Sequence, residues 1–313
     1  MASGGAVPVE GPLLALVGPT ASGKSEASIE LAERLGAEIV CVDSATVYRG
    51  MDIGTAKPGP EQRARVPHHL LDVAEPSEPF AVARYQELAR LAIDEIHARD
   101  RRVLLVGGSG LYLRAIVDDL AFPPTDPEVR LGLEREAILV GARGMHRRLE
   151  HLDPAAAGRI EPDNVRRTVR ALEVAEVTGR PFSSYAGAWD RYPADRLRAV
   201  GVRIPRPVLA ERIVRRVRAQ VADGFADEVR GLAARGLGGW LTASRAIGYA
   251  ELARHLAGEL TLEDAIARTI KRTKALARRQ LAWFRRDPRI RWFEAGAGGA
   301  MPIVPELTGS LRG

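Results

Sequence analysis

Short apolar runs alternate with longer stretches of helical periodicity over the first 120 residues of the chain. The runs that predict strands are Leu13–Val17, Glu38–Val42 and Val103–Val106, and the stretches that predict helices are Ser22–Leu35, Phe80–Arg99 and Leu111–Asp119. Strands and helices that alternate at this spacing are typical of βαβ units, in which helices join parallel strands. The pattern therefore predicts an α/β fold built on a parallel sheet.

The pattern changes at Phe122-Pro-Pro-Thr-Asp-Pro127. From Glu128 to about Thr178 the periodicity is helical, and strand character returns only at Leu197–Ile204. Further helices are expected at about Pro207–Arg235, Ala243–Leu256 and Leu262–Arg286, followed by a short apolar stretch at Ile290–Phe293. We predict an α/β core with C-terminal helices over residues 12–122 and 196–294, an all-helical insertion over 123–195, a disordered tail over 1–11 and a flexible tail over 295–313.

The composition is that of an ordinary globular protein, with 46% hydrophobic and 27% charged residues. No apolar run reaches the ~18 residues that a membrane-spanning helix needs, so no membrane contact is expected. The 46 basic residues outnumber the 40 acidic ones, which permits a polyanionic partner without proving one. Cys41 is the single cysteine, which excludes a disulfide framework. The first residues lack the pattern of a secretory signal, so the expected location is the cytoplasm.

One motif predicts a phosphate-binding loop between the first strand and the first helix. The sequence Gly18-Pro-Thr-Ala-Ser-Gly-Lys-Ser25 matches G-x-x-x-x-G-K-[ST], with Gly18, Pro19, Thr20, Ala21, Ser22, Gly23, Lys24 and Ser25 at its eight positions. Glycines let backbone N–H groups approach an anion, the helix N-terminus adds partial positive charge, and Lys24 adds a full one. The Ser25 hydroxyl can ligate Mg²⁺. The motif therefore predicts that a di- or triphosphate binds here.

The class of phosphate chemistry is narrowed by what surrounds the loop. Asn164 is the only asparagine, so the N-K-x-D motif of GTPases is absent. The strand at Val103–Val106 ends in Gly107-Gly-Ser-Gly and not in the aspartate usual in ATPases. The available carboxylate is Asp43, which follows the second strand and should face the ligand crevice. A helix cap or an indirect Mg²⁺ contact is an alternative role for Asp43, and a P-loop kinase of a small metabolite is an alternative class.

The last long helix is expected to carry one basic face. At 100° per residue its cations fall within one arc of about 160°, and the apolar residues fall outside it. The cations are Lys271, Arg272, Lys274, Arg278, Arg279, Arg285 and Arg286. Such a face suits binding to a phosphate backbone, and a second basic cluster at Arg166, Arg167 and Arg170 favours nucleic acid over a solvated surface.

Taken in order, the motifs resemble those of the tRNA dimethylallyltransferases, also called IPP transferases. Besides the phosphate loop, the resemblance rests on segments spread from about Leu13 to Phe293. They are Val42-Asp-Ser-Ala45, Tyr48-Arg-Gly-Met-Asp-Ile-Gly-Thr-Ala-Lys-Pro58, Pro67-His-His-Leu-Leu-Asp72, Val106-Gly-Gly-Ser-Gly-Leu-Tyr112, Asp126-Pro-Glu-Val-Arg130, Arg170-Ala-Leu-Glu-Val174, Gly224-Phe-Ala-Asp-Glu-Val229, Ala246-Ile-Gly-Tyr249 and Arg278-Arg-Gln-Leu-Ala-Trp-Phe-Arg285. The block Met51–Pro58 is much more specific than the phosphate loop.

The resemblance implies a P-loop NTPase-like core with a helical insertion that grips the anticodon stem-loop of tRNA. It implies transfer of a dimethylallyl group from dimethylallyl diphosphate to N6 of the adenosine 3′ of the anticodon, with Mg²⁺. By the resemblance, Asp43 is the general base that accepts a proton from the adenine amine. Lys24, Ser109 and Arg230 are expected to stabilise the departing diphosphate. The tRNA-contacting residues that it implies are Asp43, Ser44, Ala45, Thr46, Ser109, Arg130, Arg166, Arg167, Thr168, Val169, Arg170, Arg245, Ala246, Ile247, Gly248, Tyr249 and Ala250. The family often has arginine where Ala250 stands, and a monomer is expected.

Overall fold

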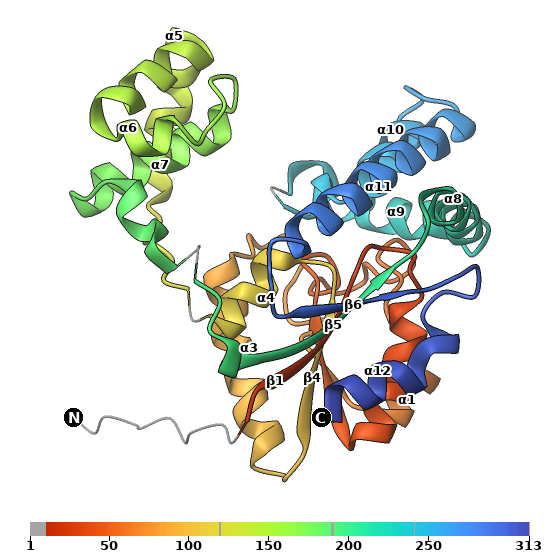
Figure 1. The fold of residues 1–313 in the computed structure, drawn as a ribbon. Coiled ribbons are helices and arrows are strands. Elements are labelled where there is room, and N and C mark those ends of the chain that lie inside the picture. The colour runs from red at the N-terminus through yellow and green to blue at the C-terminus, as the bar shows by residue number, and fades with distance from the viewer. Residues whose placement is uncertain (1–10, 119, 189–190, 241, 313) are drawn as a thin grey trace. The chain divides into compact units, whose positions relative to one another are not determined.

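A parallel sheet forms the centre of the larger part of the chain (Figure 1). The computed structural model describes residues 11–118, 120–188, 191–240 and 242–312. Within these residues the sheet has six strands in the order β3-β2-β4-β1-β5-β6, and all neighbouring strands are parallel. The strands are β1 (Leu13–Val17), β2 (Ala37–Val42), β3 (His68–His69), β4 (Arg102–Gly107), β5 (Leu197–Arg203) and β6 (Ile290–Glu294). The predicted α/β fold with a parallel sheet is confirmed.

Helices cover both faces of the sheet, because alternate residues of each central strand face opposite sides. Leu14 and Leu16 of β1 belong to one hydrophobic cluster, which α1 (Lys24–Leu35) and α12 (Val304–Arg312) complete. Ala15 and Val17 belong to the other, which α3 (Val82–His97) and α4 (Gly110–Val117) complete. The continuous apolar run of β1 is therefore buried on both sides.

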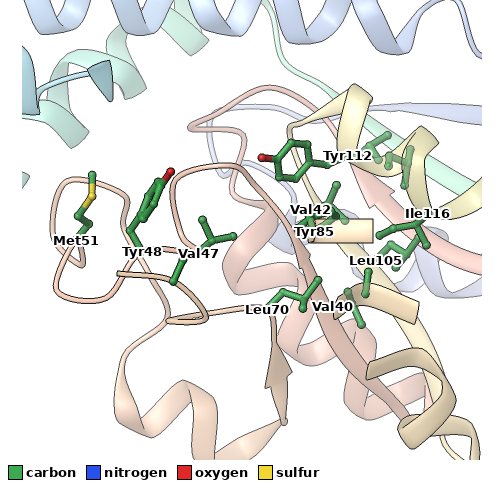
Figure 2. Packing of buried hydrophobic residues seen from close by; sticks show 14 of the residues in the cluster. Val40, Val42, Val47, Tyr48, Met51, Leu70, Tyr85, Leu105, Tyr112 and Ile116 are labelled. Carbon is green, nitrogen blue, oxygen red and sulfur yellow. The ribbon is translucent and has the colours of Figure 1, made fainter. Parts of the chain in front are cut away.

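The second cluster reaches the ends of the strands, where the candidate site begins (Figure 2). The rings of Tyr85 and Tyr112 lie 4.3 Å apart between their centroids and pack beside Val42 and Leu105. The Tyr85 hydroxyl donates a hydrogen bond of 2.8 Å to the carbonyl oxygen of Cys41. Burial raises the pKa of the Cys41 thiol to about 12, with a smaller contribution from the charge of Asp43. The thiol is thus protonated. The hydrogen bond from Tyr85 and the apolar contacts around Val42 hold this end of β2 in place.

A group of helices follows β5. They are α8 (Arg206–Ala222), α9 (Phe225–Ala234), α10 (Tyr249–Leu256) and α11 (Leu262–Phe284), with the 3₁₀ turns η3 (Leu237–Gly239) and η4 (Ala243–Arg245) between α9 and α10. The single helix predicted over Pro207–Arg235 is two helices, because Gly224 adopts a left-handed φ of 97° that ends the first and precedes the second. A short helix, α2 (Pro60–Arg65), also lies between β2 and β3.

The prediction of a flexible tail over residues 295–313 is wrong for the part that the structure describes. The turn η5 (Met301–Ile303) leads into α12, whose Val304, Leu307 and Leu311 are fully buried. Figure 1 shows α12 beside α1, and the Arg312 guanidinium donates to the carbonyl oxygen of Arg34 at 2.6 Å. The predicted N-terminal tail lies outside the described residues, except for Gly11.

The described residues divide into two compact units, those within 1–118 and 192–313 and those within 119–191. The second unit is helical, and its own core includes Leu133, Met145 and Leu172. Its helices are α5 (Pro127–Leu152, interrupted at Gly141), α6 (Pro154–Ala157), α7 (Val165–Thr178) and η1 (Phe182–Ala188), while η2 (Ala194–Arg196) belongs to the first unit. Both boundaries fall four residues before the predicted ones. None of the described helices is long and apolar enough to span a membrane.

Candidate functional site

Three neighbouring strands end at the same level, which brings three predicted segments to one edge of the sheet. Gly107 of β4 is in register with Val17 of β1 on one side and with Val42 of β2 on the other. The phosphate loop, Asp43 and the Gly108–Ser109 turn follow these residues directly. The carbonyl oxygen of Val42 accepts hydrogen bonds of 3.2 Å from the N–H groups of both Gly108 and Ser109. A Cβ at Gly107 would lie 2.0 Å from that oxygen, which explains the glycine.

Lys24 is almost fully buried at the start of α1. Its ammonium donates to the carbonyl oxygen of Pro19 at 2.6 Å and to the Ser22 hydroxyl at 3.2 Å. Burial, and secondarily the charge of Arg216, lower its pKa from 10.5 to about 7, and Asp43 opposes the shift. Since an ammonium has three donors, one is left for an anion. An anionic ligand would therefore stabilise the charged form of Lys24 and raise its pKa again.

Arg216 on α8 is a site residue that the sequence analysis missed. It is half-buried and makes no hydrogen bond or ion pair with any other residue that the structure describes. Burial lowers the pKa of its guanidinium, and the negative charge of Asp43 acts in the opposite sense. Arg216 thus lies close enough to Lys24 for its charge to lower the pKa of the lysine. The signal in the sequence was helical spacing, since Arg216 lies between Ile213 and Val217, which α8 buries.

Arg230, the arginine expected in this role, is elsewhere. It lies on α9, where its guanidinium pairs with Asp227 one turn away, and its side chain is 62% exposed. Arg216 occupies the place beside Lys24 and Asp43. The role expected for Arg230 stays a prediction, and Arg216, which precedes Gly224 where Arg230 follows it, is a second candidate for that role.

Asp43 has both a local contact and a place in the site. Its Oδ1 accepts the N–H of Ala45 at 2.8 Å, which stabilises the turn after β2. Its charge also raises the pKa values of Lys24 and Arg216, so the carboxylate lies near both cations. This contact closes a turn and is not a helix cap, because the next helix begins only at Pro60, and it leaves the second oxygen for another partner. Whether Asp43 acts as a base stays a prediction.

The hydroxyls of Ser25 and Ser109 lie at the N-termini of two helices. Ser25 is exposed in the first turn of α1, and Ser109 precedes α4 without capping it through its side chain. The described residues hold no cluster of three His, Cys, Asp or Glu that could bind a metal by itself. Mg²⁺ in phosphate sites usually has few protein ligands and takes the remaining oxygens from phosphate and water. The Ser25 hydroxyl beside the phosphate loop fits such a site.

Gln280 on α11 joins the basic helix to the phosphate loop, a role that no sequence motif indicated. Its Oε1 accepts the N–H of Thr20 at 2.8 Å, and its side chain is buried. A Cβ at Gly108 would lie 2.2 Å from its Nε2, and a Cβ at Gly110 would lie 1.7 Å from the ring of Trp283. The glycines around Ser109 therefore let α11 approach closely. A polar residue on the buried face of α11 was the available signal.

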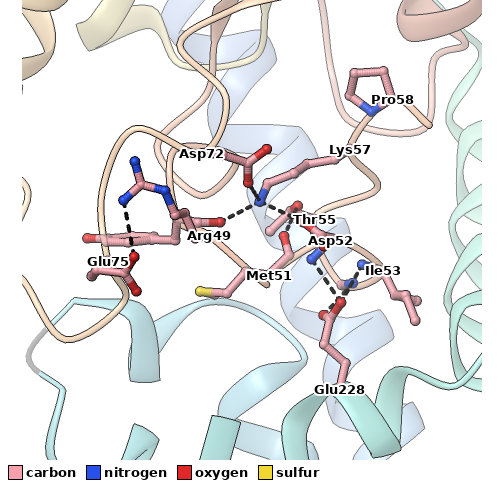
Figure 3. A network of polar contacts seen from close by, with 12 residues as sticks. Arg49, Met51, Asp52, Ile53, Thr55, Lys57, Pro58, Asp72, Glu75 and Glu228 are labelled. Atoms are coloured by element: carbon pink, nitrogen blue, oxygen red, sulfur yellow. Dashed lines mark hydrogen bonds and ion pairs between the residues drawn. The ribbon is translucent and has the colours of Figure 1, made fainter. Parts of the chain in front are cut away.

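The block Met51–Pro58 forms a loop around a buried lysine (Figure 3). The Lys57 side chain is 1% exposed, and its ammonium donates to Asp72 at 2.6 Å, to Asp52 at 2.7 Å and to the carbonyl oxygen of Tyr48. All three donors are thus used within the protein. Lys57 therefore fixes the loop that follows the Asp43 turn.

Glu228 on α9 holds the same loop from the other side (Figure 3). Its carboxylate accepts the N–H groups of Asp52, Ile53 and Gly54 at 2.8, 2.7 and 3.2 Å, and the Tyr249 hydroxyl at 2.6 Å. Burial and the Glu228 charge raise the pKa of Tyr249 far above its usual value. Because Tyr249 is 0% exposed, its side chain does not reach the surface as an RNA contact would require. In the same segment Arg245 is exposed, Gly248 is buried, and Ala246, Ile247 and Ala250 are half-buried.

The tRNA contacts predicted beside Asp43 also differ from one another in exposure. Ser44 is exposed and Ala45 half-buried, whereas Thr46 is buried.

The basic cluster of the insertion separates into exposed and paired residues. Arg130 and Arg170 both pair with the fully buried Glu173, at 2.6 and 2.8 Å. Arg170 also donates to the carbonyl oxygens of Pro123 and Pro124. Arg166 and Arg167 are exposed on α7, whereas Thr168 and Val169 are buried in the core of the insertion. Only Arg166 and Arg167 of this set are thus fully available to an anionic partner.

These features define a phosphate-loop protein with a basic helix attached to the loop. Comparison of the chain with known proteins identifies its family. The profile of the IPP transferase family matches residues 46–287. A tRNA dimethylallyltransferase of Streptomyces coelicolor is 51% identical over 299 residues, which are 96% of this chain and 95% of the relative. The chain belongs to the IPP transferase family, and the predicted resemblance is confirmed.

Solved structures agree with this assignment. The full-length tRNA isopentenylpyrophosphate transferase of Bacillus halodurans is 40% identical, with a TM-score of 0.69 over 97% of each chain. A eukaryotic dimethylallyltransferase acting on tRNA is 24% identical, with a TM-score of 0.74 over 92% of this chain and 74% of the other. At that identity the second likeness supports the fold alone.

Proposed function

We propose that the chain transfers a dimethylallyl group from dimethylallyl diphosphate to N6 of the adenosine 3′ of the anticodon in tRNA. The observation that carries the proposal is the pair of cations, Lys24 and Arg216, which lie together at the phosphate loop with lowered pKa values. A bound diphosphate would relieve their repulsion. The names and the high identity of the relatives favour this reaction over phosphorylation of a small metabolite.

In this reaction the C–O bond to the diphosphate breaks and a bond forms between the allylic carbon and the adenine nitrogen. Lys24, Arg216 and Ser109 would stabilise the negative charge on the leaving diphosphate. When bound at Ser25, Mg²⁺ would supply further positive charge to its oxygens. The exocyclic amine is a poor nucleophile, because its lone pair is delocalised into the ring. Asp43 would accept the proton that the amine loses.

We propose the anticodon stem-loop as the acceptor because its bases are unpaired, so the adenine can leave its stack at low cost. The exposed cations Lys271, Arg278 and Arg279 on α11 and Arg166 and Arg167 on α7 would bind its phosphates. Such an enzyme would act where tRNA is, in the cytoplasm, and we propose that it works as a monomer.

The test is transfer of label from dimethylallyl diphosphate to an anticodon stem-loop without ATP. The expected products are dimethylallyl-adenosine and diphosphate. An absolute requirement for ATP, or phosphate in the modified product, would instead assign the protein to the kinase class.

The role of Asp43 is tested with Asp43→Asn, which keeps the size and removes the basicity. Single-turnover transfer with saturating substrates should fall by roughly 10²–10⁴-fold, the range for loss of a positioned acid or base. A loss of about 1 kcal/mol of stability with most of the rate kept would instead assign Asp43 a structural role in the turn after β2. Rescue by raised Mg²⁺ would assign Asp43 to the metal.

A further inference from the structure

Three consecutive residues of the phosphate loop are held by three distant parts of the chain. Gln280 of α11 accepts the N–H of Thr20 at 2.8 Å. The Arg212 Nε of α8 donates to the carbonyl oxygen of Ala21 at 2.8 Å. The N–H of Ala300 donates to the carbonyl oxygen of Ser22 at 3.1 Å. The C-terminal segment that the sequence predicted to be flexible thus contacts the loop directly.

Arg212 ties the last two of these contacts together. Its Nη1 donates to the carbonyl oxygen of Ala297 at 2.7 Å while its Nε holds Ala21. Gly299 and Gly23 make this close approach possible: a Cβ at Gly299 would lie 2.8 Å from Arg212, and one at Gly23 would lie 3.0 Å from the nitrogen of Ala300. The packing of α12 on α1 keeps the segment 297–300 in place.

These contacts matter for anion binding because of the geometry of the peptide group. In a trans peptide the carbonyl oxygen and the next N–H point in opposite directions. A donor that holds the carbonyl of Ala21 therefore directs the N–H of Ser22 the other way, and a donor on Ser22 does the same for Gly23. A phosphate loop binds its ligand through such N–H groups. Donors on the carbonyl side fix the N–H groups on the anion side.

Ala21 is the residue that most needs this support. Its φ is 62°, in the left-handed region that side chains with a Cβ disfavour by about 1–2 kcal/mol. Such a conformation persists only where its surroundings determine it.

We propose that Arg212 is a positioning residue that, with residues 297–300, keeps Ala21 left-handed and the loop N–H groups directed at the diphosphate. The residues 297–300 lie beyond the part of the chain that the family profile matches. The inference rests on the proposed role of the loop as the diphosphate site.

The test measures binding of inorganic diphosphate with Mg²⁺ by calorimetry. Arg212→Gln should weaken binding about tenfold, the effect of one or two lost hydrogen bonds, and leave affinity for the stem-loop unchanged. Arg215→Gln is the matched control, because Arg215 is an exposed arginine on the same helix and its loss changes the net charge equally. In an Ala21→Gly background, where left-handed φ carries no penalty, the effect of Arg212→Gln should shrink to less than about threefold.

Binding by Arg212→Gln at the level of wild type or of Arg215→Gln would overturn the proposal. So would an equal loss in the Ala21→Gly background, because the loss would then be one of charge alone. If Arg212→Gln does not fold, Gly299→Val replaces it: it disturbs the same contacts without a change in charge, and unaltered binding would also overturn the proposal. A wild type that binds no diphosphate would instead contradict the proposed function.

Discussion

At the scale of single residues, the site is governed by positive charge held in a poorly solvated place. Removing two neighbouring cations from water, even in part, costs free energy, which a protein tolerates where a ligand supplies the opposite charge. Lys24 and Arg216 are such a pair, and Asp43 offsets part of the repulsion. The lowered pKa values are therefore those expected of cations that an anionic ligand would stabilise.

The first prediction concerns protons taken up on binding. The pKa of Lys24 lies near 7 without an anion, and a diphosphate beside it should move that pKa back toward 10.5. Between these values binding must protonate Lys24, so close to one proton per site should be taken up at pH 8 and little below pH 6. Calorimetry in buffers of different ionisation enthalpy measures this uptake. Lys24→Arg, which stays charged, is the control and should lack it.

The second prediction separates the two arginines. Arg216→Gln should weaken diphosphate binding and slow transfer by roughly 10–100-fold, because a charge-assisted hydrogen bond contributes about 1.5–3 kcal/mol. Arg230→Gln should change neither, since its exposed pair with Asp227 contributes little. Diphosphate titration of both variants decides the matter, and a larger loss in Arg230→Gln would restore the original expectation.

Which site residues could be predicted depends on how local their constraints are. The phosphate loop and Asp43 follow from a contiguous motif and from the rule that strand ends face the ligand. Arg212, Arg216 and Gln280 lie on α8 and α11, more than 180 residues after the phosphate loop in the sequence. Their roles depend on how those helices pack on the loop, which no local pattern specifies.

At the scale of elements, α11 shows what periodicity can and cannot predict. Its buried residues include Ile266, Ala277 and Phe284, so the basic arc does face outward as predicted. The helix ends at Phe284, however, and Arg285 and Arg286 lie in the following turn. Arg272 is held by Glu251 and by the carbonyl oxygen of Arg245. The free part of the basic face is therefore narrower than the sequence implied.

The third prediction tests that face. Replacing Arg278 and Arg279 with Gln should weaken binding of the stem-loop and lower the slope of log K against log[salt] by about 0.7–0.9 per lost contact. Binding of diphosphate should not change, because both side chains are exposed and neither makes a hydrogen bond or ion pair with a described residue of the loop. The control replaces Arg34 and Arg84, two exposed arginines paired elsewhere. An unaltered slope would reduce the basic face to a solvated surface.

The segment that precedes the C-terminal helix shows that composition alone can mispredict flexibility. The sequence Ala295-Gly-Ala-Gly-Gly-Ala300 is small and rich in glycine, which is typical of a flexible linker. Here the glycines allow close packing against Arg212 and the phosphate loop. Composition indicates what a segment can do, and tertiary contacts decide what it does.

At the scale of the whole molecule, the chain leaves and re-enters the sheet unit at one charged cluster. The Arg289 guanidinium pairs with Asp118 at 2.7 Å and with Asp287 at 2.7 Å. Asp118 also pairs with Arg114. Both guanidinium groups lie over the ring of Tyr192, whose centroid is 4.2 Å from the guanidinium carbon of Arg114 and 5.3 Å from that of Arg289. Two carboxylates and two guanidinium groups balance one another in this buried site, which agrees with the rule that buried charges are paired. Asp118 and Tyr192 are the last and first residues of the sheet unit around the insertion.

The last prediction follows from that arrangement. Because one arginine contacts both Asp118 and Tyr192, a linker of about six Gly and Ser residues should join them in place of residues 119–191. The shortened protein should fold and bind diphosphate as the full chain does, since the sheet, the phosphate loop and α11 lie outside the insertion. Its affinity for the stem-loop should fall on the order of a hundredfold with the loss of Arg166 and Arg167 and the remaining insertion surface. Calorimetry with diphosphate and titration of the stem-loop measure the two affinities separately. A shortened protein that keeps its affinity for RNA would show that α11 alone binds the substrate, and one that loses diphosphate binding would show that the phosphate loop depends on the insertion.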